Sequence, residues 1–126
     1  MRGLGGLLRV FVFSMAILAL AVTGTGVASA AVYTVGDQRG WTYNVAAWPK
    51  GKRFKAGDVL VFKYDPAKHN VVPVSAAGYN SCSAPKNART LNSGNGRVTL
   101  KRGRNYFISS SAGDCENGMK IAVDAN

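Results

Sequence analysis

The chain has 126 residues, with 16 lysines and arginines against 6 aspartates and glutamates, which gives a net charge of +10 at pH 7. This length allows one small domain and excludes a second. The excess positive charge predicts attraction to polyanions, but nucleic acid is disfavoured as the partner because the sequence has no aromatic-basic nucleic-acid motif.

The first 30 residues have the pattern of a cleaved secretory signal peptide. A basic start with Arg2 and Arg9 precedes an almost unbroken apolar run, Val10–Val22, and Ala28-Ser29-Ala30 fits a small-residue cleavage site. A membrane anchor is the alternative, but the run is shorter than the roughly 20 residues that a spanning helix needs. We therefore expect residues 1–30 to be removed and residues 31–126 to form the mature domain.

The mature domain would keep 96 of the 126 residues, and its net charge would fall from +10 to +8 because Arg2 and Arg9 leave with the signal. The sequence ends at Val123-Asp124-Ala125-Asn126 without an apolar tail, so we expect no glycolipid anchor. The domain is thus expected to be secreted and extracellular, without a membrane anchor.

Short runs of strand-forming residues follow one another along the mature chain, separated by turn residues. We expect strands at Ala31–Val35, Val59–Tyr64, His69–Val74, Val98–Leu100, Asn105–Ile108 and Lys120–Val123. Both faces of Val59–Tyr64 are largely apolar, which predicts a central strand. Pro73 lacks a backbone donor, so its strand is expected at a sheet edge or a bulge.

The connecting segments are rich in turn residues. Ser75–Gly96 is expected to be mostly loop, and Lys101–Arg104, which contains a glycine, is expected to be a hairpin connection. Helices are expected to be short at most, with weak signals near Ala46–Lys50 and Pro85–Arg89. Many short strands at close intervals predict an all-β Greek-key sandwich.

The two cysteines, Cys82 and Cys115, both lie in the mature domain. In an oxidising secretory setting they are expected to form one disulfide, and two cysteines allow only one pairing. Closing such a loop would stabilise the domain by roughly 3–4 kcal/mol on the chain-entropy model. A bridged Cys115 also cannot serve as a thiolate ligand.

Short, specific motifs are spread along nearly all of the 96 mature residues. They are AVYTVG at 31–36, GWT at 40–42, WPKGKRF at 48–54, AGDVLVF at 56–62, HNVV at 69–72, YFI at 106–108 and GMKIAV at 118–123. In these segments the chain resembles the plantacyanins, the basic blue protein branch of the plant phytocyanins. The resemblance implies a cupredoxin-like β-sandwich, a location in the apoplast or cell wall, and, in ordinary members, electron transfer by one copper ion.

The resemblance also implies where copper ligands would lie. A blue-copper site uses two imidazoles, one thiolate and a weak axial thioether. The family's first histidine falls on His69 and its axial methionine on Met119, whereas its cysteine position holds Ser109 and its second histidine position holds Asp114. His69 and Met119 are thus remnant ligands, and the copper site is expected to be degraded.

Two readings of the function follow from this ligand set. We expect a binding or interaction protein of the extracellular matrix, with no redox role, no enzyme activity and no cofactor. The alternative is a copper-binding electron-transfer protein like ordinary phytocyanins. A weak Cu(II) site made by His69, Asp114 and Met119 stays open, but serine hydroxyl and carboxylate oxygen are hard donors that would not support a reversible Cu(I)/Cu(II) couple.

Ligand positions around a common metal lie close to one another, so Ser109, His69 and Asp114 are expected to converge. Such a set superficially resembles a Ser-His-Asp hydrolase. That activity also needs an oriented base and an oxyanion hole, and no nucleophile elbow is present in the sequence. Hydrogen bonding among the three side chains, as a structural plug without metal, is the favoured interpretation.

Two basic clusters provide candidate residues for binding a polyanion. They are Lys50, Lys52, Arg53 and Lys55 in one, and Lys101, Arg102 and Arg104 in the other. Because the protein is expected to be secreted, an acidic polysaccharide or another extracellular polyanion is the expected partner. We expect the protein to act as a monomer.

Overall fold

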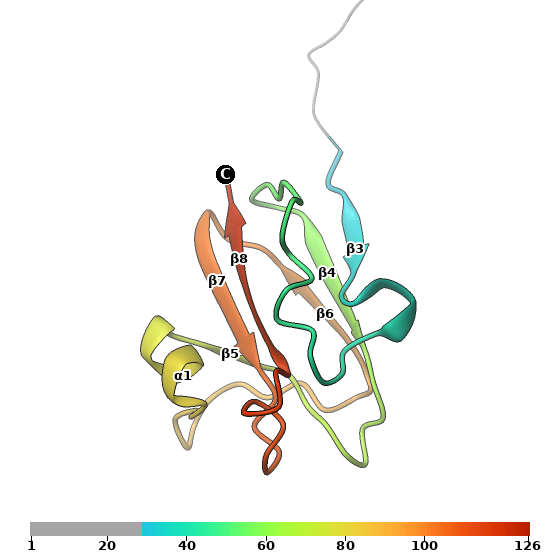
Figure 1. Cartoon of the computed structure of the whole chain (residues 1–126). Coiled ribbons are helices and arrows are strands. Elements are labelled where there is room, and N and C mark those ends of the chain that lie inside the picture. The colour runs from blue at the N-terminus through green and yellow to red at the C-terminus, as the bar shows by residue number, and fades with distance from the viewer. Residues whose placement is uncertain (1–28) are drawn as a thin grey trace, which may run out of the picture.

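The computed structural model describes residues 29–126, so almost all of the expected signal peptide, residues 1–30, lies outside the described residues. The described chain forms six strands, one short α-helix and one 3-10 turn (Figure 1). In chain order they are β3 (Val32–Thr34), η1 (Asp37–Arg39), β4 (Val59–Lys63), β5 (Val72–Val74), α1 (Ala76–Ser81), β6 (Asn95–Thr99), β7 (Gly103–Ile108) and β8 (Lys120–Ala125). Within residues 29–126, no helix has the length and apolar character needed to cross a membrane.

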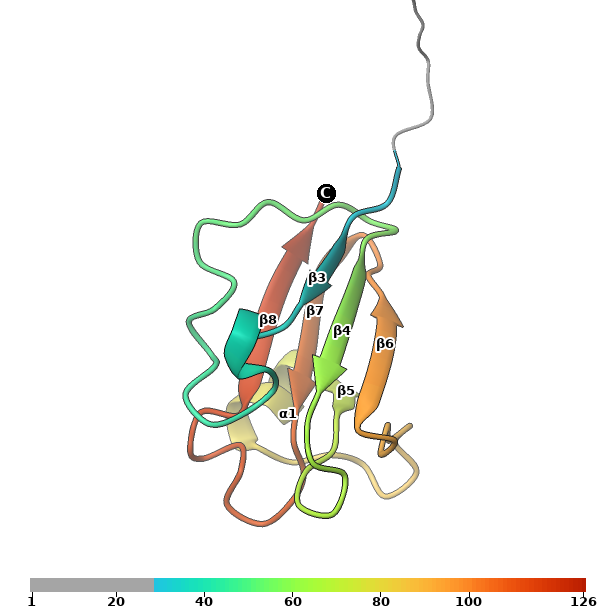
Figure 2. The same cartoon turned by 90° about the vertical axis from the view of Figure 1, so that its right-hand side faces the viewer.

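The strands form two three-stranded sheets, in the orders β3-β4-β6 and β5-β7-β8. Figure 2 shows the first sheet in front of β7 and β8 of the second. Strand β3 runs parallel to β4, and the other strand pairs are antiparallel. The expected all-β cupredoxin-like sandwich with one disulfide and at most short helices is confirmed.

Aromatic side chains fill the space between the sheets. Trp41, Phe62 and Phe107 are buried, and the Phe62 ring contacts both others, with ring centroids 5.0 Å from Trp41 and 5.3 Å from Phe107. Met119 and Ile121 belong to the same cluster of buried side chains. Burial of these large apolar surfaces supplies most of the driving force that brings the sheets together.

The expected strands overlap the observed ones, although β6 begins at Asn95, inside the segment expected to be loop. Two expectations about the place of the strands in the sheets are confirmed. Strand β4 lies between β3 and β6, as its two apolar faces predicted. Strand β5, which contains Pro73, is an edge strand and pairs only with β7 in its sheet. Strand β5 is shorter than expected, because His69 and Asn70 belong to the preceding loop.

The expected hairpin at Lys101–Arg104 is wrong, because β6 pairs with β4 and β7 pairs with β5 and β8. The chain instead crosses from one sheet to the other. Leu100, only 2% exposed, ties the end of β6 to the start of β4: its N–H donates to the Asp58 carbonyl at 2.8 Å, and its carbonyl accepts from Gly57 at 2.9 Å. These two hydrogen bonds mark the end of the first sheet, and the chain then turns toward the second sheet.

The helical expectations are also corrected. The structure places a helix at Ala76–Ser81, inside the segment expected to be loop, and the Ser75 hydroxyl caps it by accepting from the Gly78 N–H. The segments 46–50 and 85–89 contain turns and irregular backbone but no helix.

Candidate functional site

His69, Ser109, Asp114 and Met119 are brought together at one end of the sandwich. His69 lies in the connection from β4 to β5, and the others lie in or next to the connection from β7 to β8. Figures 1 and 2 show these two connections at the same end, opposite the C-terminus. Backbone hydrogen bonds fix the second connection: Ser109 N–H donates to the Met119 carbonyl, and Met119 N–H donates to the Asp114 carbonyl, each at 3.0 Å.

The centre of this arrangement is the Asp114 carboxylate. Its Oδ2 atom accepts a hydrogen bond from the Ser109 hydroxyl at 2.6 Å and lies 2.6 Å from His69 Nδ1. Ser109 is fully buried, Asp114 is 3% exposed, and the His69 side chain is 11% exposed. We call these three side chains the Asp114 cluster. A buried carboxylate is tolerated only when it is paired and hydrogen-bonded, and both conditions are met here.

The order of contacts bears on the hydrolase alternative. In a Ser-His-Asp triad the histidine lies between the other two residues and takes the serine proton. Here Asp114 lies between Ser109 and His69, and no hydrogen bond joins Ser109 to His69 among the contacts of the described residues. The expected convergence and hydrogen bonding of the three side chains are confirmed, whereas the contact that would activate the serine is not made.

Three further residues, Trp41, Tyr43 and Asn70, hold His69 in place. The Asn70 side chain joins the two connections, accepting from Ser110 N–H at 2.8 Å and donating to the Ser110 hydroxyl at 3.0 Å. The indole of Trp41 donates to the Asn70 carbonyl at 2.8 Å, and the Tyr43 ring packs edge-on against the imidazole of His69 at 5.5 Å. In the sequence, only the position of Asn70 directly after His69 indicated that one of these residues belongs to the site.

Met119 and the disulfide complete the surroundings. Met119 is fully buried and packs in the main core cluster. The expected bridge between Cys82 and Cys115 is confirmed, with Cα atoms 5.6 Å apart. It links the end of α1 to the residue that follows Asp114. Among residues 29–126, no group of three or more His, Cys, Asp or Glu side chains is arranged to hold a metal ion.

Asp114→Ala is expected to destabilise the fold by about 3 kcal/mol, because it leaves the buried Ser109 hydroxyl and His69 Nδ1 without their shared acceptor. Ser109→Ala is the matched control and should cost only about 1 kcal/mol, since Asp114 keeps its contact with His69. Urea unfolding followed by tryptophan fluorescence measures both values. Equal losses in the two variants would contradict the central place of Asp114 in the cluster.

Four of the seven basic candidate residues line two hollows away from the Asp114 cluster. Lys50, Lys52 and Arg104 line a hollow of about 290 Å³, so residues far apart in sequence share one surface. Lys101 and Arg104 line a second hollow of about 460 Å³. The other candidates, Arg53, Lys55 and Arg102, line neither hollow.

Comparisons with known proteins agree with this fold. The family model of the plastocyanin-like domain matches residues 28–119. Chemocyanin of Lilium longiflorum is 52% identical over 124 residues, covering 98% of each chain. The structure of cucumber basic protein, a blue copper protein, has a TM-score of 0.75 at 50% identity, and that of spinach plantacyanin 0.68 at 55%; both are fully covered and match 76% of this chain. The chain therefore belongs to the phytocyanin family of cupredoxins, in its plantacyanin, or basic blue protein, branch.

Proposed function

We propose that this phytocyanin is a secreted protein without a redox or enzymatic role, and that its basic surface binds acidic polysaccharide of the extracellular matrix. The observation that carries the proposal is the Asp114 cluster. A carboxylate and a hydroxyl occupy the positions assigned to an imidazole and a thiolate, and they satisfy each other by hydrogen bonding.

The donor set does not fit a blue-copper centre. Such a centre needs a soft thiolate, and the two cysteines of the chain are bonded to each other. The remaining donors are the Ser109 hydroxyl, the Asp114 carboxylate, the His69 imidazole and the Met119 thioether. The imidazole nitrogen that faces the cluster is already in contact with Asp114. No electron-transfer step through copper follows from these residues.

The charge of the domain supports the second half of the proposal. The mature chain would carry +8, and Lys50, Lys52 and Arg104 lie around one hollow, which Asp124, in contact with Arg104, also lines. Positive charges gathered on one surface raise the local concentration of a polyanion and its rate of association. An extracellular polysaccharide rich in carboxylates is the polyanion that a secreted protein would meet.

The mature protein is expected to be retained on a column of de-esterified pectin at low salt and released by added NaCl. The screening length falls from about 10 Å at 0.1 M to about 3 Å at 1 M, so an electrostatic contact weakens over this range. Fully methyl-esterified pectin, which has the same backbone without the charge, should not retain the protein. Retention that ignores salt, or its complete absence, would overturn the proposed binding.

Two double variants locate the surface. Lys50→Gln/Lys52→Gln removes two charges beside the hollow, whereas Lys68→Gln/Lys86→Gln removes two charges from residues that line neither hollow. We expect the first variant to elute at clearly lower salt than the second. Identical elution would show that total charge alone governs retention, and would contradict a defined basic surface.

A further inference from the structure

The larger hollow lies where the two sheets open along their edges. Its residues come from the edge strands β5 and β6, from β7, and from the loops before and after β6. Its volume of about 460 Å³ lies within the range of small-ligand sites, which is about 300–1,000 Å³. We call this hollow the edge cleft. It is separate from the Asp114 cluster, none of whose residues line it.

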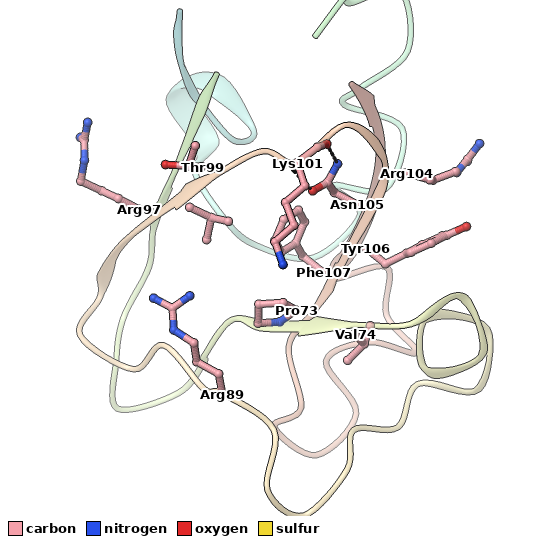
Figure 3. Close-up of a pocket in the computed structure, with 11 residues that line it drawn as sticks. Pro73, Val74, Arg89, Arg97, Thr99, Lys101, Arg104, Asn105, Tyr106 and Phe107 are labelled. Atoms are coloured by element: carbon pink, nitrogen blue, oxygen red, sulfur yellow. Dashed lines mark hydrogen bonds between the residues drawn. The ribbon is translucent and has the colours of Figure 1, made fainter. Parts of the chain in front are cut away.

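The cleft combines an apolar floor with cationic side chains. Pro73 and Val98, both half-buried, contribute apolar surface, whereas Phe107 is only 2% exposed. Figure 3 shows Lys101 extending over Phe107 toward Pro73, while Arg89 rises from the opposite side toward the same opening. No aspartate or glutamate is among the described residues that line the cleft, so these two cations face it without a carboxylate partner there.

Two other arginines line the cleft but point away from its centre. Figure 3 shows Arg97 directed outward on one side and Arg104 on the other. Arg104 is also engaged elsewhere: its Nη1 lies 3.4 Å from Asp124 Oδ2, and its guanidinium lies over the Tyr106 ring at 5.8 Å. Arg97 and Arg104 therefore contribute charge at the rim of the cleft, whereas Arg89 and Lys101 face its opening.

Asn105 fixes the turn that carries Lys101. Its Oδ1 accepts from the Lys101 N–H at 3.1 Å, and its Nδ2 donates to the carbonyls of Lys101 and Gly103 at 2.9 and 3.1 Å. Gly103 has φ of 101°, a conformation that side chains other than glycine rarely adopt. These hydrogen bonds fix the backbone from which the Lys101 side chain extends over the cleft.

We propose that the edge cleft binds one carboxylated sugar unit of an acidic polysaccharide, with the carboxylate between Lys101 and Arg89. This inference rests on the proposed function and adds a site for one sugar unit beside the hollow lined by Lys50 and Lys52. The C–H face of a sugar ring matches the apolar surface that Pro73 and Val98 offer in the cleft. An inorganic anion would contact only the two cations and would leave the apolar surface of the cleft exposed to water. An acidic sugar would contact both, and it is therefore the better match for the cleft.

Titration of the ¹⁵N-labelled mature protein with tri-galacturonic acid, followed by amide chemical shifts, tests the site. The largest shifts are expected at Val74, Thr99 and Lys101–Phe107. Arg89→Gln and Lys101→Gln should each weaken binding about tenfold, because each removes a charge-assisted hydrogen bond. Arg97→Gln and Arg104→Gln remove the same charge from the rim and should weaken binding less than about threefold, as expected for exposed charges.

The outcomes separate this proposal from the proposed function. Equal weakening by all four variants, with wild-type protein still released from pectin by salt, would overturn the cleft while leaving polysaccharide binding intact. Absence of salt-sensitive retention by wild-type protein would overturn the proposed function as well. Tri-galacturonic acid methyl ester should not bind. Equal affinity for that ester, or for inorganic sulfate, would overturn the assignment of a carboxylated sugar as the ligand.

Discussion

Mixed with Cu(II), the wild-type mature protein is expected to stay colourless, whereas the double variant Ser109→Cys/Asp114→His is expected to turn blue and to hold one copper ion per molecule. The intense colour of a blue-copper protein arises from the copper–thiolate bond, which the wild-type chain cannot form. The variant supplies the thiolate and the second imidazole. Since loss of even outer-sphere partners changes metal affinity by 10–100-fold, restoring two direct ligands should raise copper affinity more than about 100-fold.

The geometry of the Asp114 cluster supports this expectation. Ser109 Oγ and His69 Nδ1 both lie 2.6 Å from Asp114 Oδ2, so side chains at these three positions already converge. Cysteine differs from serine at position 109 by one atom, and the backbone there is fixed by its bond to the Met119 carbonyl. The site therefore needs new donor atoms and not a new fold.

Single variants provide the controls for the copper experiment. Asp114→His alone should bind Cu(II) through nitrogen and oxygen without the intense absorption, while Ser109→Cys alone should show a weaker and less stable colour. Metal analysis and a visible spectrum measure both properties, and mass spectrometry checks that the Cys82–Cys115 bridge is intact. A blue wild-type protein with one tightly bound copper ion would overturn the proposed loss of redox function.

Removal of the disulfide by Cys82→Ala/Cys115→Ala is expected to lower the free energy of unfolding by about 3–4 kcal/mol, because the bridge closes a loop of 33 residues. A domain of this size has a total stability of only about 5–15 kcal/mol. The corresponding fall in melting temperature is expected to be about 15–25 °C. Thermal and urea unfolding of the mature protein measure these losses.

The position of the bridge explains why its effect should be confined to stability. Cys115 packs with Val72 and Ile108 in a small buried cluster that also contacts Cys82 next to α1. The bridge thus joins α1 and the β7–β8 connection to the second sheet. The folded fraction of the variant should keep the salt-dependent retention of wild-type protein, since neither cysteine lines the basic hollows. A loss below about 1 kcal/mol would contradict the chain-entropy argument.

Local sequence features were sufficient to predict where the strands lie and whether β4 and β5 are central or edge strands. The two apolar faces of Val59–Tyr64 predicted a central strand, and Pro73 predicted an edge strand, because both properties depend on the residues of the strand itself. The disulfide was equally determined, since two cysteines allow one pairing. The short helix at Ala76–Ser81 was missed because its residues, which include glycine, asparagine and serine, favour loops, and its Ser75 cap gave only a weak signal.

Which strands pair with one another could not be predicted from local sequence features. The glycine-containing segment between β6 and β7 predicted a hairpin, but the buried Leu100 is bonded to the start of β4, some 40 residues earlier in the chain, and this contact ends the first sheet. The edge cleft exists only because the chain crosses between sheets at this point. Basic residues that appeared as two sequence clusters also took different roles, depending on which way each side chain points.

The sequence by itself determined the fold class, the disulfide and the residue types at the positions that correspond to copper ligands in the family. Only the tertiary structure decided how those residues contact one another. Asp114 lies between Ser109 and His69 because the β7–β8 connection folds back on itself while His69 arrives from a loop 45 residues away along the chain. Residue type and spacing are local properties, whereas the direction of a hydrogen bond across a buried cluster depends on the packing of segments that are distant in sequence.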